Sequence, residues 1–325
     1  MDVVVFGAGS WGTALTLILA RNGHNVFLAD HTEHDAALLR SDRENKRYLP
    51  GFEFPENINI LGPNDDVPVC AFSVLAIPTA FVRSNLTRFE GQSVVCVASK
   101  GLDPETGGTL SQVVSEGVPG VKVVSLSGPN LAVELARGIP TAAVSASHDE
   151  AAADLVRNAF MGPTYRVYLS QDPLGVELAG ALKNVIAIGA GISDGMGFGD
   201  NTKGAFLARG LGEMTKLGMA LGARMETFLG LAGVGDLFAT AASKLSRNYR
   251  VGFALGQGMS LDEAVASLGQ VAEGVPTCKV ALRLAAEKGV DVPLMTTLYE
   301  VMHAEIEVGE ALTRLMERRT PTELN

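Results

Sequence analysis

The segment from Val3 to Leu15, VVVFGAGSWGTAL, contains three glycines with the spacing GxGxxG. This pattern follows an apolar, β-branched run and opens a stretch of helical character, which is the context that dinucleotide binding requires. There Gly7 allows a tight turn, Gly9 lets the backbone approach a pyrophosphate, and Gly12 lets the helix pack close to the strand. The helix N-terminus then offers backbone N–H groups to the anion. A purely structural turn is the alternative.

An acidic residue ends the second apolar run of the chain. Asp30 follows Gly12 by 18 residues, and a carboxylate at this place accepts hydrogen bonds from the adenosine ribose, which favours NAD over NADP. His31 comes next and is compatible with a 2′-phosphate, so the pattern leaves both cofactors open. The alternative for Asp30 is a plain loop residue before a helix.

A single lysine interrupts the most apolar part of the second half. Lys183 is the only charged residue between Leu178 and Ser193. A lysine on an apolar helix must reach solvent, pair with a carboxylate or lose its proton more readily. In the last case it can act as a general acid or base. A snorkelling surface lysine is the alternative.

Polar side chains gather at two further places. The segment from Ser246 to Arg250, SRNYR, follows Asp236 and offers a hydroxyl, two guanidinium groups and an amide. Because a guanidinium fork matches the oxygens of a phosphate, Arg247 predicts a phosphate site, with a polar helix start as the alternative. Lys100 lies just past an apolar strand, where ligands of open α/β sheets bind, although a solvated loop lysine fits the same pattern.

Alternating strands and helices are expected to position these residues in the first half. Short apolar runs predict strands at residues 3–6, 26–29, 58–61, 69–77, 94–98, 121–126, 142–145 and 166–169. Helices are predicted at residues 13–21, 32–39, 109–115, 131–137 and 150–160. Continuous apolar strands between helices indicate a parallel sheet that is covered on both faces.

The chain changes character after Asp172. From there to Met316 apolar residues recur at helical spacing without a convincing strand. We therefore predict an α/β protein, with an N-terminal Rossmann-like, doubly wound domain over residues 1–171 and an all-α substrate domain over residues 172–325. The polar tail at residues 318–325 is expected to be frayed.

Composition excludes several classes of protein. The 325 residues carry a net charge of −10, which disfavours nucleic acids and anionic membranes as partners. Three widely spaced cysteines and five scattered histidines predict neither a disulfide framework nor a metal site. The N-terminus lacks a basic leader, and no uncharged apolar stretch reaches about 18 residues. A cytoplasmic protein without membrane insertion is therefore expected.

Eight segments run in a fixed order along nearly the whole chain: GAGSWGTAL, ARNGH, ASKGL, LSGPNLAVELARGIPTA, ELAGALKNVIAIGAGI, GDNTKGA, GLAGVGDLFAT and SRNYRVGFALGQG. Together they resemble the bacterial-type NAD(P)-dependent glycerol-3-phosphate dehydrogenases. The resemblance implies a reversible hydride transfer between NAD(P)H and C2 of dihydroxyacetone phosphate, which yields sn-glycerol 3-phosphate for phospholipid synthesis. It also implies a homodimer.

The resemblance further implies roles for individual residues. Lys183 is implied as the proton donor in reduction and the acceptor in oxidation. Contacts to the substrate are implied for Lys100, Gly128, Asn130, Lys183, Asp236, Ser246, Arg247 and Asn248. Besides Gly7, Gly9, Gly12 and Asp30, contacts to the cofactor are implied for Ser10, Trp11, His31, Lys100, Ala132, Arg247, Val271 and Glu273. Asn130 stands where the family commonly has Ser or Thr, so the polar contact expected there is altered.

Two other functions compete with this one. A related dehydrogenase of the same architecture, acting on a 3-hydroxy acid or a sugar acid phosphate, also uses a lysine on a helix after the sheet. The cluster of GDL and SRNYR argues against it, because the resemblance places that cluster with the glycerol phosphate enzymes. A dinucleotide sensor without catalysis is the second competitor, and it has no need for Lys183 or Arg247.

Overall fold

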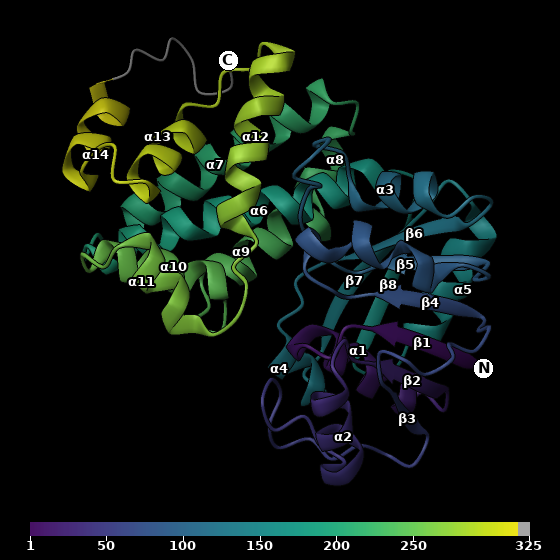
Figure 1. Cartoon of the computed structure of the whole chain (residues 1–325). Helices are drawn as coiled ribbons and strands as arrows, with labels where there is room; N and C mark the ends of the chain where they lie inside the picture. The colour runs from purple at the N-terminus through teal and green to yellow at the C-terminus, as the bar shows by residue number, and fades with distance from the viewer. Residues whose placement is uncertain (318–325) are drawn as a thin grey trace. The chain divides into compact units, whose positions relative to one another are not determined.

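The computed structural model describes residues 1–317 and divides the chain into two compact units (Figure 1). Unit 1 contains residues 1–100 and 108–176, and unit 2 contains residues 101–107 together with the chain from Glu177 onward. The predicted boundary at residue 171 falls just before the helix that runs from one unit into the other, whereas the sequence pattern does not foresee that residues 101–107 belong with unit 2. The tail predicted to be frayed, residues 318–325, lies outside the described residues.

Unit 1 is built on one eight-stranded sheet with the order β3-β2-β1-β4-β5-β6-β7-β8. Its strands are β1 (Asp2–Phe6), β2 (Asn25–Ala29), β3 (Ile58–Leu61), β4 (Phe72–Leu75), β5 (Val94–Val97), β6 (Lys122–Ser127), β7 (Thr141–Ala146) and β8 (Tyr165–Ser170). All eight lie at or within the runs predicted as strands, give or take a residue at each end. The sheet also confirms the Rossmann-like class.

The sheet is parallel as predicted except at one pair of strands. β7 pairs with β6 in antiparallel fashion, although β7 and β8 are parallel to each other. A parallel connection needs a crossover that runs back along the sheet. The only helix between β6 and β7, α4 (Ala132–Ala136), has five residues, which is too short to carry the chain back.

Helices cover both faces of this sheet, as Figure 1 shows. They are α1 (Ser10–Arg21), α2 (Glu33–Asp42), α3 (Leu110–Gly117), α4 and α5 (Glu150–Phe160), with 3-10 turns η1 (Thr79–Phe81) and η2 (Arg83–Phe89). Alternate residues of β1 point to opposite faces, so Val3 belongs to the apolar core with α1 and α5, and Val4 to the core with η2 and α3. The unit is therefore doubly wound, as predicted.

Unit 2 is all-α over the residues that the structure describes, and no strand occurs between residues 173 and 317. Its helices are α6 (Pro173–Gly195), α7 (Asp200–Ala220), α8 (Met225–Leu229), a π-helical turn η3 (Leu231–Gly235), α9 (Asp236–Ala241), α10 (Arg247–Gly256), α11 (Leu261–Leu268), α12 (Gly274–Lys288), α13 (Pro293–Met302) and α14 (Val308–Glu317). Pro173 occupies the first turn of α6, where its missing N–H costs nothing.

The helix α6 forms the core of this unit. By length and composition it is apolar enough to cross a membrane, but its apolar window is entirely buried inside the protein. Two glycines of α10 make its contact with α6 unusually close. A Cβ added to Gly252 would collide with the carbonyl of Ile188, and one added to Gly256 would lie 2.6 Å from the carbonyl oxygen of Ile192. The two helix backbones are therefore in direct contact at these positions.

Candidate active site

The glycine turn after β1 has the backbone geometry that its sequence predicts. Gly7 has φ +111°, which disfavours any side chain, and a Cβ there would lie 2.5 Å from the carbonyl oxygen of Ala76. A Cβ on Gly12 would collide with the carbonyl of Gly7 itself. Both positions therefore require glycine, Gly7 because of its positive φ and the nearby backbone of Ala76, and Gly12 because α1 begins directly against the turn.

The N-terminus of α1 leaves room for an anion. Gly9 is the N-cap, no side chain caps this end of the helix, and the first turn holds no acidic residue. A Cβ added to Gly9 would meet nothing within 4 Å. Ser10, the first residue of α1, donates from its hydroxyl to the carbonyl of Tyr48 at 2.6 Å. This open, positively polarised helix end fits the pyrophosphate of a dinucleotide.

Trp11 and Lys100 lie beside the same turn. The indole N–H of Trp11 donates to the carbonyl of Ala98 at 2.9 Å, and Nζ of Lys100 lies 5.9 Å from the centre of the indole ring. Lys100 also donates to the carbonyl of Gly128 at 2.9 Å. Unit 1 thus brings together the predicted residues that follow β1, β5 and β6, at the carboxyl ends of these strands.

Asp30 follows β2 and stabilises the turn that leads into α2. Its side chain is buried, and Oδ1 accepts from the backbone N–H of Thr32 at 2.9 Å and lies 3.3 Å from Nδ1 of His31. Thr32 in turn caps α2, since its hydroxyl accepts from the N–H of Asp35 at 3.0 Å. The side-chain hydrogen bonds of Asp30 among residues 1–317 all involve Oδ1. His31 is highly exposed.

Asn130 is held from two strands. Its Nδ2 donates to the carbonyl of Ala142 on β7 at 3.1 Å, and its Oδ1 accepts from the hydroxyl of Tyr165 on β8 at 3.1 Å. The amide therefore ties the loop before α4, which begins at Ala132, to the sheet.

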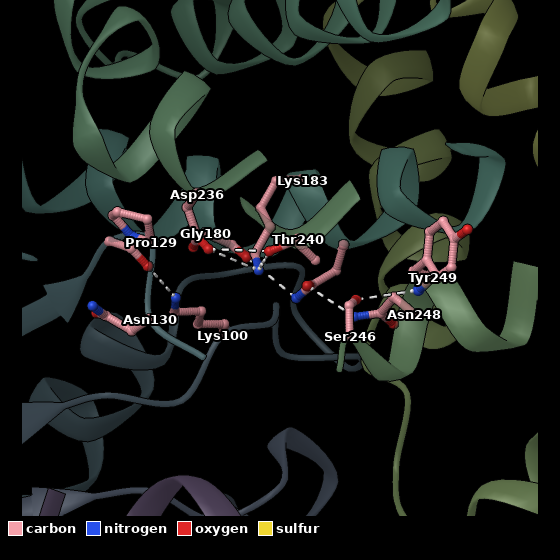
Figure 2. A network of polar contacts seen from close by, with 12 residues as sticks. Lys100, Pro129, Asn130, Gly180, Lys183, Asp236, Thr240, Ser246, Asn248 and Tyr249 are labelled. Carbon is pink, nitrogen blue, oxygen red and sulfur yellow. Dashed lines mark hydrogen bonds and ion pairs between the residues drawn. The ribbon is translucent and has the colours of Figure 1, made fainter. Parts of the chain in front are cut away.

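Lys183 is buried on α6, with its ammonium inside a polar cluster (Figure 2). Nζ lies 2.6 Å from Oγ1 of Thr240 and 3.1 Å from Oδ1 of Asp236, and Thr240 Oγ1 lies 3.2 Å from the same carboxylate oxygen. Asp236 is almost fully buried as well. The ammonium is thus paired inside the protein, which excludes the snorkelling surface lysine. A buried, paired ammonium is suited to stabilising a negative oxygen and transferring a proton to it.

Thr240 is a site residue that the sequence analysis missed. It lies four positions after Asp236 on α9, so both side chains share one face of the helix. The π-helical turn η3 comes just before Asp236, and a Cβ on Gly233 within it would collide with the carbonyl of Phe228. Such bulges are frequent at functional sites. The spacing of Asp236 and Thr240 was the signal that could have identified the second residue.

The start of α10 carries the predicted phosphate group ligands. Ser246 caps the helix, since its hydroxyl accepts from the N–H of Tyr249 at 3.2 Å. Desolvation lowers the pKa of the Arg247 guanidinium, and the negative charge of Glu273 opposes that shift. Glu273 is also the N-cap of α12, so this predicted cofactor residue lies within electrostatic reach of Arg247. Val271, two residues earlier, is exposed.

Asn248 is committed to contacts within unit 2. Its Nδ2 donates to Oδ1 of Asn184 at 2.9 Å, and its Oδ1 accepts from the N–H of Gly274 at 2.9 Å. Gly274 has no room for a Cβ, which would lie 2.5 Å from the carbonyl oxygen of Asn184. Asn248 therefore joins α6, α10 and the start of α12, and only one of its amide hydrogens is left for a substrate. Asn184 is a second residue that the sequence analysis did not single out.

The cysteines and histidines form no evident reactive centre among residues 1–317. Cys70, Cys96 and Cys278 are buried thiols without disulfides. Burial raises the pKa of Cys70 to about 11 and that of Cys278 to about 12, and it raises the pKa of Cys96 as well. No group of three or more potential metal ligands occurs in the described part of the chain.

Comparison with known proteins identifies a family over both units. The chain matches the model for the N-terminus of NAD-dependent glycerol-3-phosphate dehydrogenase at residues 2–153 and the model for its C-terminus at residues 172–313. It is 43% identical to a glycerol-3-phosphate dehydrogenase (NAD(P)+) of Chlorobium phaeobacteroides over 99% of both chains. A protein of the same name from Geobacillus kaustophilus is 45% identical over 100% of this chain and 96% of its own. The glycerol-3-phosphate dehydrogenase structure from Coxiella burnetii has a TM-score of 0.93 at 34% identity, covering 98% of this chain and 99% of that one.

Proposed function

Because the chain belongs to the NAD-dependent glycerol-3-phosphate dehydrogenase family, whose members are NAD(P)-dependent oxidoreductases, we propose that it interconverts dihydroxyacetone phosphate and sn-glycerol 3-phosphate. The observation that carries the proposal is the buried cluster of Lys183, Asp236 and Thr240. A cluster of this kind supplies the proton that reduction of a ketone requires. A dinucleotide sensor without catalysis would have no use for it.

Unit 1 would bind the dinucleotide. The open N-terminus of α1 would hold the pyrophosphate by its backbone N–H groups, with Gly9 allowing close approach. Oδ2 of Asp30 would accept from the adenosine ribose, and exposed His31 leaves space for a 2′-phosphate. When bound, the nicotinamide supplies the hydride that goes to C2 of the ketone. The other cofactor contacts that the resemblance implies, at Trp11, Lys100, Ala132, Arg247, Val271 and Glu273, form part of the same proposal.

The proton comes from Lys183. Negative charge grows on the C2 oxygen as the hydride arrives, and an ammonium nearby stabilises that oxygen and protonates it. Asp236 would pair with the ammonium, and Thr240, whose hydroxyl lies 3.2 Å from the same carboxylate oxygen, would fix its orientation from the same side. In the oxidation of glycerol 3-phosphate, the neutral amine would accept the alcohol proton.

The phosphate group of the substrate would bind at the start of α10. Arg247 provides the guanidinium fork, and the helix N-terminus adds a favourable dipole. Ser246 and the remaining amide hydrogen of Asn248 are neutral partners. Lys100, Gly128 and Asn130 would complete the substrate contacts.

The direct test is to mix the purified protein with dihydroxyacetone phosphate and to follow the loss of reduced nicotinamide absorbance, with NADH and NADPH in parallel. We expect consumption, and the ratio of the two rates reports how the site around Asp30 and His31 treats the 2′-phosphate. Binding of cofactor without consumption would contradict the proposed reaction. Assays with 3-keto acids and sugar acid phosphates would then test the related-dehydrogenase alternative.

We further propose that the enzyme acts as a cytoplasmic homodimer and that its product supplies phospholipid synthesis, as the resemblance implies. Its acidic net charge of −10 supports the absence of nucleic-acid partners, and we propose no insertion into a membrane. Sedimentation equilibrium at several protein concentrations tests the dimer. A single species with the mass of one chain would contradict it.

A further inference from the structure

The segment GDNTKGA, residues 199–205, has no role in the proposed reaction, yet it contributes to a polar cluster in unit 2. Nζ of Lys203 on α7 lies 2.6 Å from Oδ2 of Asp194 on α6. The hydroxyl of Tyr249 on α10 donates to the same oxygen, also at 2.6 Å. Lys203 Nζ lies 5.3 Å from the centre of the Tyr249 ring as well. One carboxylate therefore joins three helices, and we call these three residues the α10 clamp.

Tyr249 places the clamp next to the phosphate-binding end of α10. It directly follows Arg247 and Asn248, and its backbone N–H donates to the capping hydroxyl of Ser246. Its ring is buried and stacks on Phe253, with the ring centres 6.2 Å apart. Burial and the Asp194 carboxylate raise its pKa to about 12, so the phenol stays protonated and keeps donating at neutral pH. In Figure 2 its hydroxyl points away from Asn248.

The clamp lies beside a close contact between α6 and α10, which two further side-chain hydrogen bonds cross, from Asn248 to Asn184 and from Gln257 to the carbonyl of Gly195. Asn248 meets Asn184, Gly252 meets Ile188, and Gly256 meets Ile192, so the contacts advance in step along both helices. α6 and α10 therefore run in the same direction with their backbones touching. Small residues let helices approach closely, but they provide little resistance to sliding or rotation. A hydrogen bond to a buried side chain on each side of the contact provides that resistance.

This geometry has a consequence for the substrate. α6 carries Lys183 as well as Asp194, and α10 carries Arg247 as well as Tyr249. The hydrogen bond between Tyr249 and Asp194 is therefore one of the contacts that link the helix with the proposed proton donor to the helix with the proposed phosphate ligand. The carbonyl oxygen and the phosphate of one substrate must fit the register of these two helices together.

We propose that Asp194, Tyr249 and Lys203 are positioning residues, which hold the start of α10 in register with Lys183 and thereby determine the affinity for the phosphate group without touching it. This inference rests on the proposed function and deepens it. It predicts that loss of the clamp weakens recognition of phosphorylated substrate selectively. The chemistry at Lys183, once the substrate is bound, is preserved.

The test uses Tyr249→Phe, which removes the hydroxyl and keeps the stacked ring. We expect KM for dihydroxyacetone phosphate to rise roughly tenfold, as for loss of one hydrogen bond to a charged group, with kcat within about a factor of two. The efficiency with phosphate-free dihydroxyacetone should not change. Asp194→Asn keeps an acceptor for the phenol but loses the ion pair with Lys203, so it should show a smaller rise. Tyr168→Phe, on an exposed tyrosine of β8, is the matched control.

A second measurement does not depend on turnover. Titration calorimetry with inorganic phosphate should show binding to the parent protein and roughly tenfold weaker binding to Tyr249→Phe. Equal phosphate affinity in both proteins, or an equal fall in efficiency with both ketones, would overturn the inference and leave the clamp a purely structural contact. Failure of the parent to reduce dihydroxyacetone phosphate would instead contradict the proposed function, while the phosphate titration would still decide the role of the clamp.

Discussion

The glycine turn of unit 1 and the lysine site of unit 2 are assembled in opposite ways. In the turn, Gly7 and Gly12 are close in sequence and their backbones already touch. In the lysine site, Nζ of Lys183 lies 2.6 Å from a threonine that is 57 positions farther along the chain. The turn follows mainly from local chain geometry, with one distant contact between Gly7 and Ala76, whereas the lysine site depends on the packing of entire helices. Substitutions should therefore act locally in unit 1 and spread between helices in unit 2.

Lys183→Ala should have the largest effect. Loss of a general acid costs about 10²–10⁴-fold in turnover, and the fold and the cofactor affinity should be retained. Because Asp236 would remain buried without its cation, we also expect the free energy of unfolding to fall by about 3–5 kcal/mol. Steady-state kinetics, cofactor titration and urea unfolding measure the three quantities.

The matched control is Lys216→Ala, which removes an exposed lysine from α7. It should leave turnover and stability close to those of the parent. Near-normal turnover of Lys183→Ala would contradict the role of the lysine as proton donor. It would also remove the basis for comparing the lysine site with the glycine turn. If the double variant Lys183→Ala with Asp236→Ala recovers stability, the loss in the single variant comes from the unpaired carboxylate of Asp236, since both charges are then gone.

Arg247→Ala should have the next largest effect. A charged hydrogen bond is worth about 1.5–3 kcal/mol, so KM for dihydroxyacetone phosphate should rise roughly 10- to 100-fold. Phosphate-free dihydroxyacetone should be a poor substrate for the parent and no poorer for the variant. Arg250→Ala, three positions later on the same helix and exposed, is the control. Equal activity of the parent on both ketones would refute the phosphate role.

Glu213 provides a stability test of the long-range packing in unit 2. This buried residue of α7 accepts from the N–H groups of Leu294 and Met295 at 2.7 and 3.1 Å, at the start of α13. Desolvation is the main cause that raises the pKa of Glu213 to about 7, and the charge of Asp291 raises it as well. The two backbone hydrogen bonds and the charge of Arg209 act in the opposite direction and lower it. The folded protein therefore holds this proton more tightly than the unfolded chain does.

The sign of the pH dependence follows from that shift. The contribution to stability is fully present below about pH 4.5, the unfolded value, and is lost as the pH rises through about 7, at a cost on the order of 3 kcal/mol. Urea unfolding between pH 4.5 and 8 should show this fall in the parent. Glu213→Gln should reduce the slope of the free energy of unfolding against pH. An unchanged slope in that variant would show that other groups cause the pH dependence.

Asp30→Ser should have the smallest effect, because it changes a local contact in unit 1. If Oδ2 accepts from the ribose, its loss should shift the ratio of NADPH to NADH efficiency upward by roughly tenfold or less. Turnover with saturating cofactor should stay nearly constant. Asp66→Ser, on an exposed loop, is the control. An unchanged cofactor ratio would remove Asp30 from the site and leave it as the turn residue that supports Thr32.

Much of unit 1 could be predicted, because each of its strands is a short apolar run with its own turn. β3 and α5 have the bounds expected from the sequence, and Thr32 caps α2 as expected. The antiparallel entry of β7 could not be predicted, because it depends on the length that α4 attains. The grouping of residues 101–107 with unit 2 likewise could not be predicted, because it depends on tertiary contacts.

The site in unit 2 was predictable only in part. Lys183 stood out as the only charge on an apolar helix, and Asp236 and Arg247 through their neighbouring residues. Thr240 was not singled out, although it lies four positions after Asp236 on one helix face, and Asn184 did not stand out because an isolated asparagine carries no pattern of its own. Their importance comes from partners that lie 57 and 64 positions away.

The amino-acid sequence by itself determined the glycine turn, the alternation of strands and helices, and the apolar helix with a single lysine. These features rest on periodicity and on the backbone freedom of single residues, which act over a few positions. Only the tertiary structure decided that Lys183 pairs with Asp236, that Asn248 joins three helices, and that Tyr249 reaches Asp194. Such contacts form where helices pack, and the fit of distant side chains, rather than any local preference, selects them.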